Sequence, residues 1–190
     1  MNNVIKMFKT HELTDTKFVH PVKITYNQNG KDKVWEAVKS FDSVAVLLFH
    51  EEKNSFLLVK QFRPPVYLND SKKLCTYELC AGIVDKDKSL EYIAKEEIDE
   101  ECGFDVPLEN IEKITSFYTN VGVSGGCQTL YYAKIDDSMK IHDGGGINDE
   151  EIEIMYLPID DYEEFIYDES KAKTPGLIFS FMWFMKNKKI

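Results

Sequence analysis

Short runs of apolar residues separated by polar turns dominate the first two thirds of the chain, a pattern typical of β-strands. The Asn29-Gly30 pair lies between two such runs and is a strong hairpin signal. A polar turn at 51–55 predicts a second hairpin, and Gly82 is expected to end a later strand. Altogether the pattern predicts strands over 18–26, 34–38, 44–49, 56–62, 74–81, 113–118, 129–134 and 152–157.

Helices are predicted at three places. Ser89 is a suitable N-cap, and Gly103 a suitable residue just past the end, for a helix over 90–102. Two more helices are expected near the end of the chain, one over 160–167 and one that begins after Thr174-Pro175.

Many strands with one central helix, followed by helices near the end, predict a layered domain of the α/β or α+β class. We expect residues 1–40 to form a small antiparallel β subdomain and residues 41–190 to form the main domain.

Composition narrows the choice of partners and compartment. The 190 residues are 43% hydrophobic and 29% charged, which excludes a disordered chain. The net charge of −10 makes nucleic acid a poor partner. The longest apolar stretch near the end, 177–185, is far shorter than the roughly 20 residues of a membrane span, and no signal peptide is evident, so we expect no membrane association. The four cysteines lack metal-binding spacing, which predicts reduced thiols and a cytoplasmic protein. The four histidines also lack ligand-like spacing and are assigned no chemistry.

A run of carboxylates lies within 95–103. On an α-helix, Glu97, Glu100 and Glu101 fall within one narrow sector beside an apolar stripe that faces the sheet. Like charges four residues apart cost about 0.2–0.5 kcal/mol per pair. Carboxylates at a helix–sheet boundary suit Mg²⁺, which leaves coordination positions for phosphate oxygens and makes bound water more acidic. The alternative interpretation is a solvated acidic face of the helix.

The same segment resembles the Nudix box, G-x5-E-x7-R-E-U-x-E-E-x-G-U, with every spacing kept. Its residues read Gly82-x5-Lys88-x7-Glu96-Glu97-Ile98-x-Glu100-Glu101-x-Gly103-Phe104. Lys88 replaces the usual Glu and Glu96 the usual Arg, so both signs are reversed. We hypothesise that Lys88 pairs with Glu96 and braces the loop against the helix; the alternative is a site that has decayed into a binding module.

The resemblance extends to the branch of this family that contains ADP-ribose and nucleoside-diphosphate-sugar pyrophosphatases, and within it to the UDP-glucose pyrophosphatase-like group. It is carried by 42–49, 58–64, 78–82, 95–104, the hairpin with Trp35 and the glycine loop 144–146. The resemblance implies the Nudix fold, a mixed β-sheet sandwiched between helices. It also implies a homodimer in which the N-terminal strands reach across to the partner subunit.

Metal ligands follow from the same resemblance. Glu97, Glu101 and the carbonyl oxygen of Ala81 would bind Mg²⁺, with Mn²⁺ as a substitute. Glu100 would bind a second ion or orient water.

Substrate contacts are also implied. Arg63 would contact the diphosphate or the terminal ribose, Glu78 a substrate hydroxyl, and Gly82 would line the substrate site. Trp35 would stack on the base or fill a subunit interface. Each assignment has an alternative. Arg63 would be a surface arginine at a strand end, Glu78 a solvent-facing carboxylate at a strand edge, and Trp35 an ordinary packing residue.

The resemblance also implies a general base in the acidic loop that follows the glycines. Either Glu150 or Glu151 would serve, and the alternative is a disordered loop with no catalytic role. ADP-ribose hydrolases often carry a glutamate near the position of Gly126, and this chain has none, which favours another sugar nucleotide.

The sequence therefore predicts Mg²⁺-dependent hydrolysis of a nucleoside-diphosphate sugar similar to UDP-glucose, giving a nucleoside monophosphate and a sugar 1-phosphate. ADP-ribose hydrolysis is the first alternative. The others are a non-catalytic module that binds nucleotide sugars and an acidic interaction module.

Overall fold

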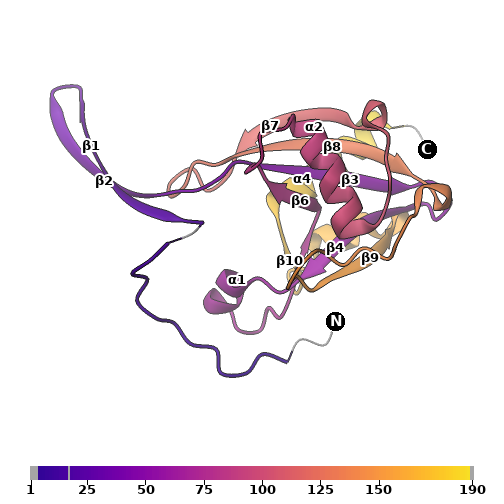
Figure 1. The fold of residues 1–190 in the computed structure, drawn as a ribbon, viewed down its shortest axis with the longest axis horizontal. Helices are drawn as coiled ribbons and strands as arrows, with labels where there is room; N and C mark the ends of the chain where they lie inside the picture. The colour runs from indigo at the N-terminus through magenta and orange to yellow at the C-terminus, as the bar shows by residue number, and fades with distance from the viewer. Residues whose placement is uncertain (1–3, 17, 189–190) are drawn as a thin grey trace.

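The computed structural model describes residues 4–16 and 18–188, which form a mixed sheet with helices on both faces and a separate hairpin (Figure 1). The main path of the sheet has the strand order β10-β5-β4-β3-β8-β7, with β6 paired to β3 and β9 paired to β4. These strands are β3 (Ser43–His50), β4 (Ser55–Gln61), β5 (Thr76–Glu78), β6 (Cys80–Ile83), β7 (Glu112–Tyr118), β8 (Cys127–Ile135), β9 (Ile152–Pro158) and β10 (Ala172–Lys173). The expected α/β architecture, with a mixed sheet between helices, is confirmed.

The central strands are buried on both faces, which explains their nearly continuous apolar sequence. On β3, Val44, Val46 and Leu48 pack into one core together with residues of α2 (Leu90–Glu97). The intervening residues Ala45, Leu47 and Phe49 pack into a second core, together with α3 (Tyr162–Tyr167) and α4 (Pro175–Asn187). In Figure 1, α2 lies in front of the sheet and α4 behind it.

The N-terminal hairpin projects from the body of the molecule (Figure 1). It consists of β1 (His20–Gln28) and β2 (Lys31–Lys39), joined through Asn29 and Gly30, which have the positive φ angles of 57° and 78° that a tight hairpin turn requires. Its attachment to the body includes a backbone hydrogen bond of 2.8 Å from Val38 N–H to the carbonyl oxygen of Val123.

Several predicted boundaries were wrong. The strand expected over 74–81 is divided into β5 and β6, because the chain leaves β4 after Glu78 and pairs with β3 from Cys80 onward. Gly82 does not end a strand; it lies within β6, opposite Val44. The six-residue helix α1 (Pro64–Asn69) was not expected, although Pro64-Pro65 fits the first turn of a helix. Strand β4 ends at Gln61, before the two prolines that were expected to end it.

The helices near the C-terminus follow the prediction with small shifts. A 3-10 turn over Ile159–Asp161 precedes α3, so the α-helix itself begins two residues later than expected. Thr174 occupies the N-cap position of α4 and Pro175 its first turn, but the Thr174 side chain makes no capping hydrogen bond. Within the described residues, no helix is long and apolar enough to cross a membrane.

Candidate functional site

The predicted carboxylates are held by α2 and by the turn that continues it. Ser89 caps α2, since its hydroxyl oxygen accepts a hydrogen bond of 3.3 Å from Tyr92 N–H. Ile93, Ala94 and Ile98 are fully buried against the sheet. This anchoring leaves Glu97 and Glu100 half-buried, whereas Glu101 is only 4% exposed.

The expected α-helix over 90–102 ends early, at Glu97, and continues as a π-helical turn over Ile98–Cys102. Gly103 ends the turn at a φ of 76°, and its N–H bonds to the carbonyl oxygens of both Asp99 and Ile98. Single π turns inside helices are frequent at functional sites. Here the turn carries Glu100 and Glu101.

Strand β6 is in contact with two of the carboxylates. The N–H of Ala81 donates to Glu101 Oε2 at 2.9 Å. A Cβ added at Gly82 would lie 2.0 Å from Glu97 Oε1, so any larger residue would displace the Glu97 carboxylate from this position. The structure thus brings Ala81, Gly82, Glu97 and Glu101 together, as the motif predicts.

Burial and mutual repulsion oppose the ionisation of these two carboxyl groups. Burial is the main cause that raises the pKa of Glu97 to about 7, and the nearby charge of Glu100 adds to it. Burial likewise raises the pKa of Glu101 to about 8, against the opposing effect of the Ala81 N–H. A bound cation would reverse these shifts, because it stabilises the ionised form.

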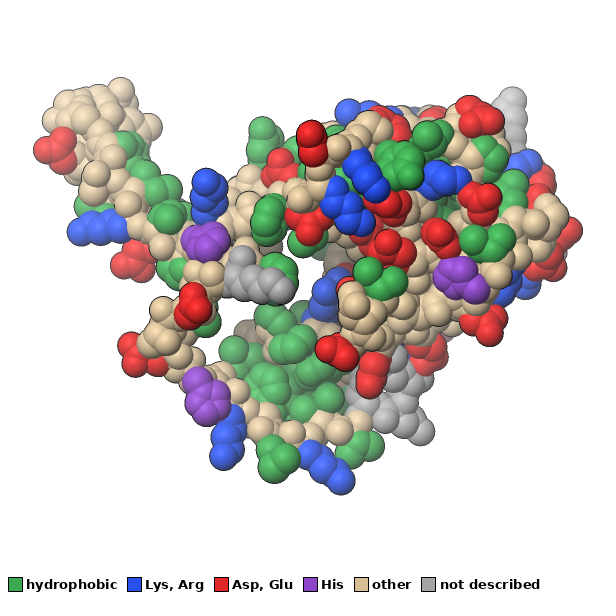
Figure 2. Space-filling model, viewed as in Figure 1, with side chains coloured by type: hydrophobic (Ala, Val, Ile, Leu, Met, Phe, Trp, Pro, Cys, Tyr) green, Lys and Arg blue, Asp and Glu red, His purple; other side chains and the backbone are tan. Residues whose placement is uncertain are grey.

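The reversed pair of the motif is in contact. Lys88 Nζ donates to Glu96 Oε1 at 2.7 Å, and Lys86 Nζ reaches Glu96 Oε2 at 3.3 Å. The expectation that Lys88 pairs with Glu96 is therefore confirmed, while Lys86 was not foreseen. In Figure 2, acidic and basic side chains are interspersed over the face that α2 covers.

Arg63 and Glu78, which were both predicted to contact the substrate, bind each other. Arg63 donates from Nε and Nη2 to the two oxygens of Glu78, at 2.8 Å each. The Thr76 hydroxyl donates to Glu78 Oε1 at 2.5 Å. The side chain of Glu78 is almost buried, which excludes the alternative of a solvent-facing carboxylate. This pairing of two predicted substrate residues was not foreseen.

The loop between η3 (Asp137–Met139) and β9 lies against the π-helical turn. Gly145 N–H donates to the carbonyl oxygen of Glu101 at 2.9 Å. Farther along the loop, Ile147 N–H donates to Glu150 Oε2 at 3.0 Å. The charge of Glu150 is among the causes that raise the pKa values of Glu97 and Glu101. This effect brings Glu150, one of the two residues predicted as the base, into electrostatic contact with the carboxylates.

Trp35 lies on the projecting hairpin and is 51% exposed. Its indole N–H donates to the carbonyl oxygen of Gly122 at 3.0 Å, which ties the hairpin to the loop between β7 and β8. Its indole ring therefore remains largely available for contact with another molecule.

Another group of metal-ligand side chains lies at the opposite end of β3. Among the described residues, His50, Glu52 and Asp137 alone place three ligand atoms of His, Cys or carboxylate side chains within 4.8 Å of one another. Lys53 Nζ lies 2.9 Å from His50 Nε2 and is ion-paired with Asp137. Because this ammonium group already contacts two of the three ligand side chains, His50 and Asp137, we assign the cluster no metal.

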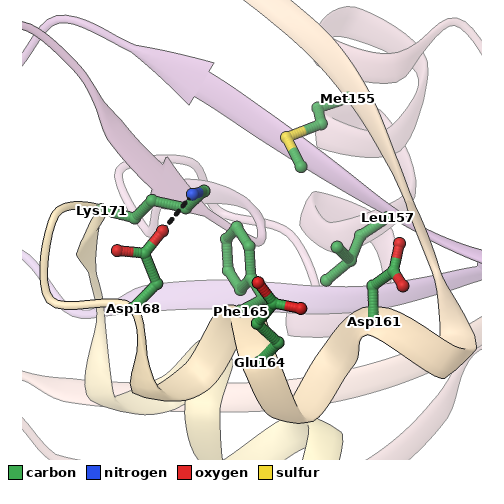
Figure 3. A pocket seen from close by; sticks show the side chains of 7 residues that line it. All are labelled: Met155, Leu157, Asp161, Glu164, Phe165, Asp168 and Lys171. Carbon is green, nitrogen blue, oxygen red and sulfur yellow. Dashed lines mark hydrogen bonds and ion pairs between the residues drawn. The ribbon is translucent and has the colours of Figure 1, made fainter.

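A cavity of about 230 Å³ lies between β9 and α3 (Figure 3). Its wall includes an ion pair of Lys171 with Asp168 and the apolar side chains of Met155 and Leu157. Met155 and Leu157 belong to the core of α3 and α4, on the opposite face of the sheet from α2. The cavity is therefore separate from the carboxylates, and none of the predicted site residues lines it.

Comparison with known proteins agrees with this geometry. The NUDIX domain model matches residues 39–175. Uridine diphosphate glucose pyrophosphatase NUDT14 is 35% identical to the chain in Bos taurus and 32% in Mus musculus, over 88% of each chain. GDP-mannose pyrophosphatase of Cronobacter sakazakii is 34% identical over 81% of each chain. The chain belongs to the Nudix family.

Proposed function

We propose that this protein hydrolyses the diphosphate bond of a nucleoside-diphosphate sugar, with UDP-glucose as the leading candidate. The products would be a nucleoside monophosphate and a sugar 1-phosphate. The observation that carries the proposal is the pair Glu97 and Glu101, held against Gly82 and Ala81 with raised pKa values. The names of the relatives support the substrate class.

The donor set fits a divalent cation, which Nudix hydrolases generally use. Within the described part of the chain, neither Glu97 nor Glu101 is ion-paired with a lysine or arginine, although both are at least half-buried. Hard oxygen donors of this kind suit Mg²⁺, with Mn²⁺ as a substitute. We assign Glu97, Glu101 and the carbonyl oxygen of Ala81 as ligands, and Glu100 as a ligand of a second ion or a residue that orients water. When bound, the cation would neutralise charge on the diphosphate and make water more acidic.

The chain's other residues would bind the substrate and move a proton. Arg63 would donate hydrogen bonds to the diphosphate, and Glu78 would accept one from a substrate hydroxyl. Gly82 would line the substrate site and leave the space that the Glu97 carboxylate occupies. Glu150, in preference to Glu151, would accept the proton of the attacking water as a P–O bond of the diphosphate bridge breaks.

We further propose that the active form is a homodimer assembled through the hairpin. Ile24 lies opposite Trp35 in the β1–β2 register, and Val22 lies opposite Ala37. Because side chains alternate between faces, these residues and Tyr26 share one face of the hairpin. Val22, Ile24, Tyr26 and Trp35 are all exposed in the single chain, and a second copy would cover them. There Trp35 would fill the subunit interface or stack on the partner's substrate base. With four free cysteines, we place the enzyme in the reducing cytoplasm.

The direct test is turnover of UDP-glucose, GDP-mannose and ADP-ribose with Mg²⁺ or Mn²⁺, scored as released nucleoside monophosphate. We expect UMP release from UDP-glucose to be fastest. Glu97→Gln and Glu101→Gln should each lower kcat by at least about a hundredfold, because each removes a charge that holds the cation. Glu109→Gln is the matched control, because it makes the same change at an exposed glutamate beyond the π-helical turn. It should retain full activity.

Three results would contradict the proposal in different ways. Faster release of AMP from ADP-ribose would overturn the substrate. Tight binding of nucleotide sugars without turnover would indicate a non-catalytic module. Unchanged turnover and ion affinity in both glutamine variants would remove the assigned site.

A further inference from the structure

The loop that carries Glu150 is attached to the π-helical turn by backbone hydrogen bonds. Gly145 N–H donates to the carbonyl oxygen of Glu101 at 2.9 Å, and Gly146 N–H donates to that of Glu100 at 3.1 Å. Carbonyl groups in the last turn of a helix lack partners within the helix. The loop therefore supplies the partners of the same two residues whose side chains we assign to the metal site.

Glycine is required on both sides of this contact. A Cβ at Gly144 would lie 2.3 Å from the carbonyl oxygen of Glu101, and a Cβ at Gly103 would lie 2.1 Å from that of His142. Both glycines also have positive φ angles, 67° and 76°. The backbone of the loop and that of the π-helical turn thus lie in direct contact, with no side chain between them. A side chain that joins the loop to the turn therefore has to belong to a residue next to these glycines.

His142 is that residue. Its Nδ1 accepts a hydrogen bond of 3.0 Å from Gly144 N–H, while its Nε2 lies 2.7 Å from Asp99 Oδ1. Because Gly144 N–H can only donate, Nδ1 has to be the unprotonated nitrogen of a neutral ring. The proton is then on Nε2 and is donated to Asp99. The imidazole of His142 thus joins Gly144, the first glycine of the loop, to Asp99 of the π-helical turn. Asp99 lies midway between Glu97 and Glu101 in the sequence.

We propose that His142 and Asp99 form a positioning pair for hydrolysis: they hold the loop on the π-helical turn and so fix Glu150 relative to the carboxylates. The proposal rests on the proposed function for its catalytic consequence. We place neither residue in contact with the substrate. Both side chains are about half exposed, at 47% and 48%, so their replacement should not prevent folding.

The first readout is hydrogen–deuterium exchange, which needs no substrate. In His142→Ala and in Asp99→Ala, the amides of Gly145 and Gly146 should exchange about threefold to tenfold faster, because a hydrogen-bonded attachment of the loop is lost. The amides of β3 should remain unchanged. The matched control is Asp105→Ala, which removes another exposed carboxylate, one that is ion-paired with Lys95 of α2. This variant should leave the exchange of the loop amides unchanged.

The second readout is the steady-state kinetics with UDP-glucose. Each alanine variant should lower kcat about tenfold with KM changed less than twofold, since the base is misplaced while substrate contacts are retained. The double variant should be no slower than either single variant, because the two side chains act as one unit. His142→Gln should recover part of kcat, because the Nε2 of the new glutamine can donate to Asp99. Asp105→Gln should have no effect.

The outcomes separate this inference from the proposed function. Unchanged exchange at Gly145 and Gly146 in both variants overturns the attachment of the loop. Faster exchange with unchanged kcat overturns the positioning role. If the wild-type protein hydrolyses none of the nucleotide sugars, the proposed function and the catalytic role of the pair fail together, and exchange alone still decides the attachment.

Discussion

Lys88 Nζ lies 2.7 Å from Glu96 Oε1 and joins the loop before α2 to the helix that carries the carboxylates. The two positions have the opposite signs in the Nudix box, so this chain keeps the contact with its charges exchanged. Lys86 adds a second ammonium group 3.3 Å from the same glutamate. Because Glu96 is ion-paired with both lysines, the contact between loop and helix is intact. This supports a functional Nudix site and argues against one that has decayed into a binding module.

Reversing only one charge of this pair should be harmful. Lys88→Glu would place two carboxylates together and should lower the melting temperature by about 2–4 °C, as expected for the loss of about 1 kcal/mol in a chain of this size. Lys88→Glu combined with Glu96→Arg should recover most of the loss in stability and turnover. Equal damage in the single and double variants, measured by thermal unfolding and UMP release, would contradict the pairing.

Gly82→Ala should disrupt the carboxylates more than the fold. The new Cβ would meet Glu97 Oε1 at 2.0 Å, so the Glu97 side chain would have to turn away. We expect a loss of at least about tenfold in Mg²⁺ affinity by titration calorimetry, with folding retained. Gly122→Ala is the control, because nothing lies within 4 Å of its added Cβ. Equal Mg²⁺ affinity in both variants would rule out the proposed contact.

In the absence of divalent cations, stability should decrease as the pH rises from about 5 to about 8. The folded pKa of Glu101, about 8, lies above its ordinary value of 4.5, so the folded chain keeps a proton that the unfolded chain releases. Urea unfolding at several pH values measures this slope. Glu101→Gln should reduce the slope and stabilise the protein at pH 8, whereas Glu109→Gln should keep it. Mg²⁺ should restore stability at pH 8; an identical slope in Glu101→Gln would refute the shift.

Dimerisation through the hairpin can be tested by a charge on its apolar face. Ile24→Glu should convert the dimer to monomers in analytical ultracentrifugation, because a buried unpaired carboxylate is costly. Thr25→Glu places the same charge on the opposite face of β1 and should leave the dimer intact. A wild-type monomer, or dimers in both variants, would exclude this interface.

Most of the fold could be predicted from the sequence because its central strands are buried on both faces. A strand that is buried on both faces requires a continuous apolar run, such as Val44 to Phe49, and such a run is easily recognised in the sequence. The two-residue strand β10 and the division at Leu79 depend on pairing partners distant in the chain, and no local pattern records them.

The site was predictable to the extent that spacing defines it. The carboxylates of 97–101 lie at fixed intervals, so their grouping beside Gly82 followed from the motif. The Arg63–Glu78 and His142–Asp99 pairs join segments 15 and 43 residues apart, and neither half of a pair carries a signal by itself. The π-helical turn was missed because its residues have ordinary helix preferences, and the loop that satisfies its carbonyls lies far along the chain.

The two cores of the molecule share one strand, since alternate residues of β3 face α2 and α4. Neither helical layer can detach without exposing half of that strand to water, so we expect the two layers to melt cooperatively. The carboxylates on the α2 side should then keep their arrangement up to that transition, and heat inactivation should coincide with unfolding of both layers.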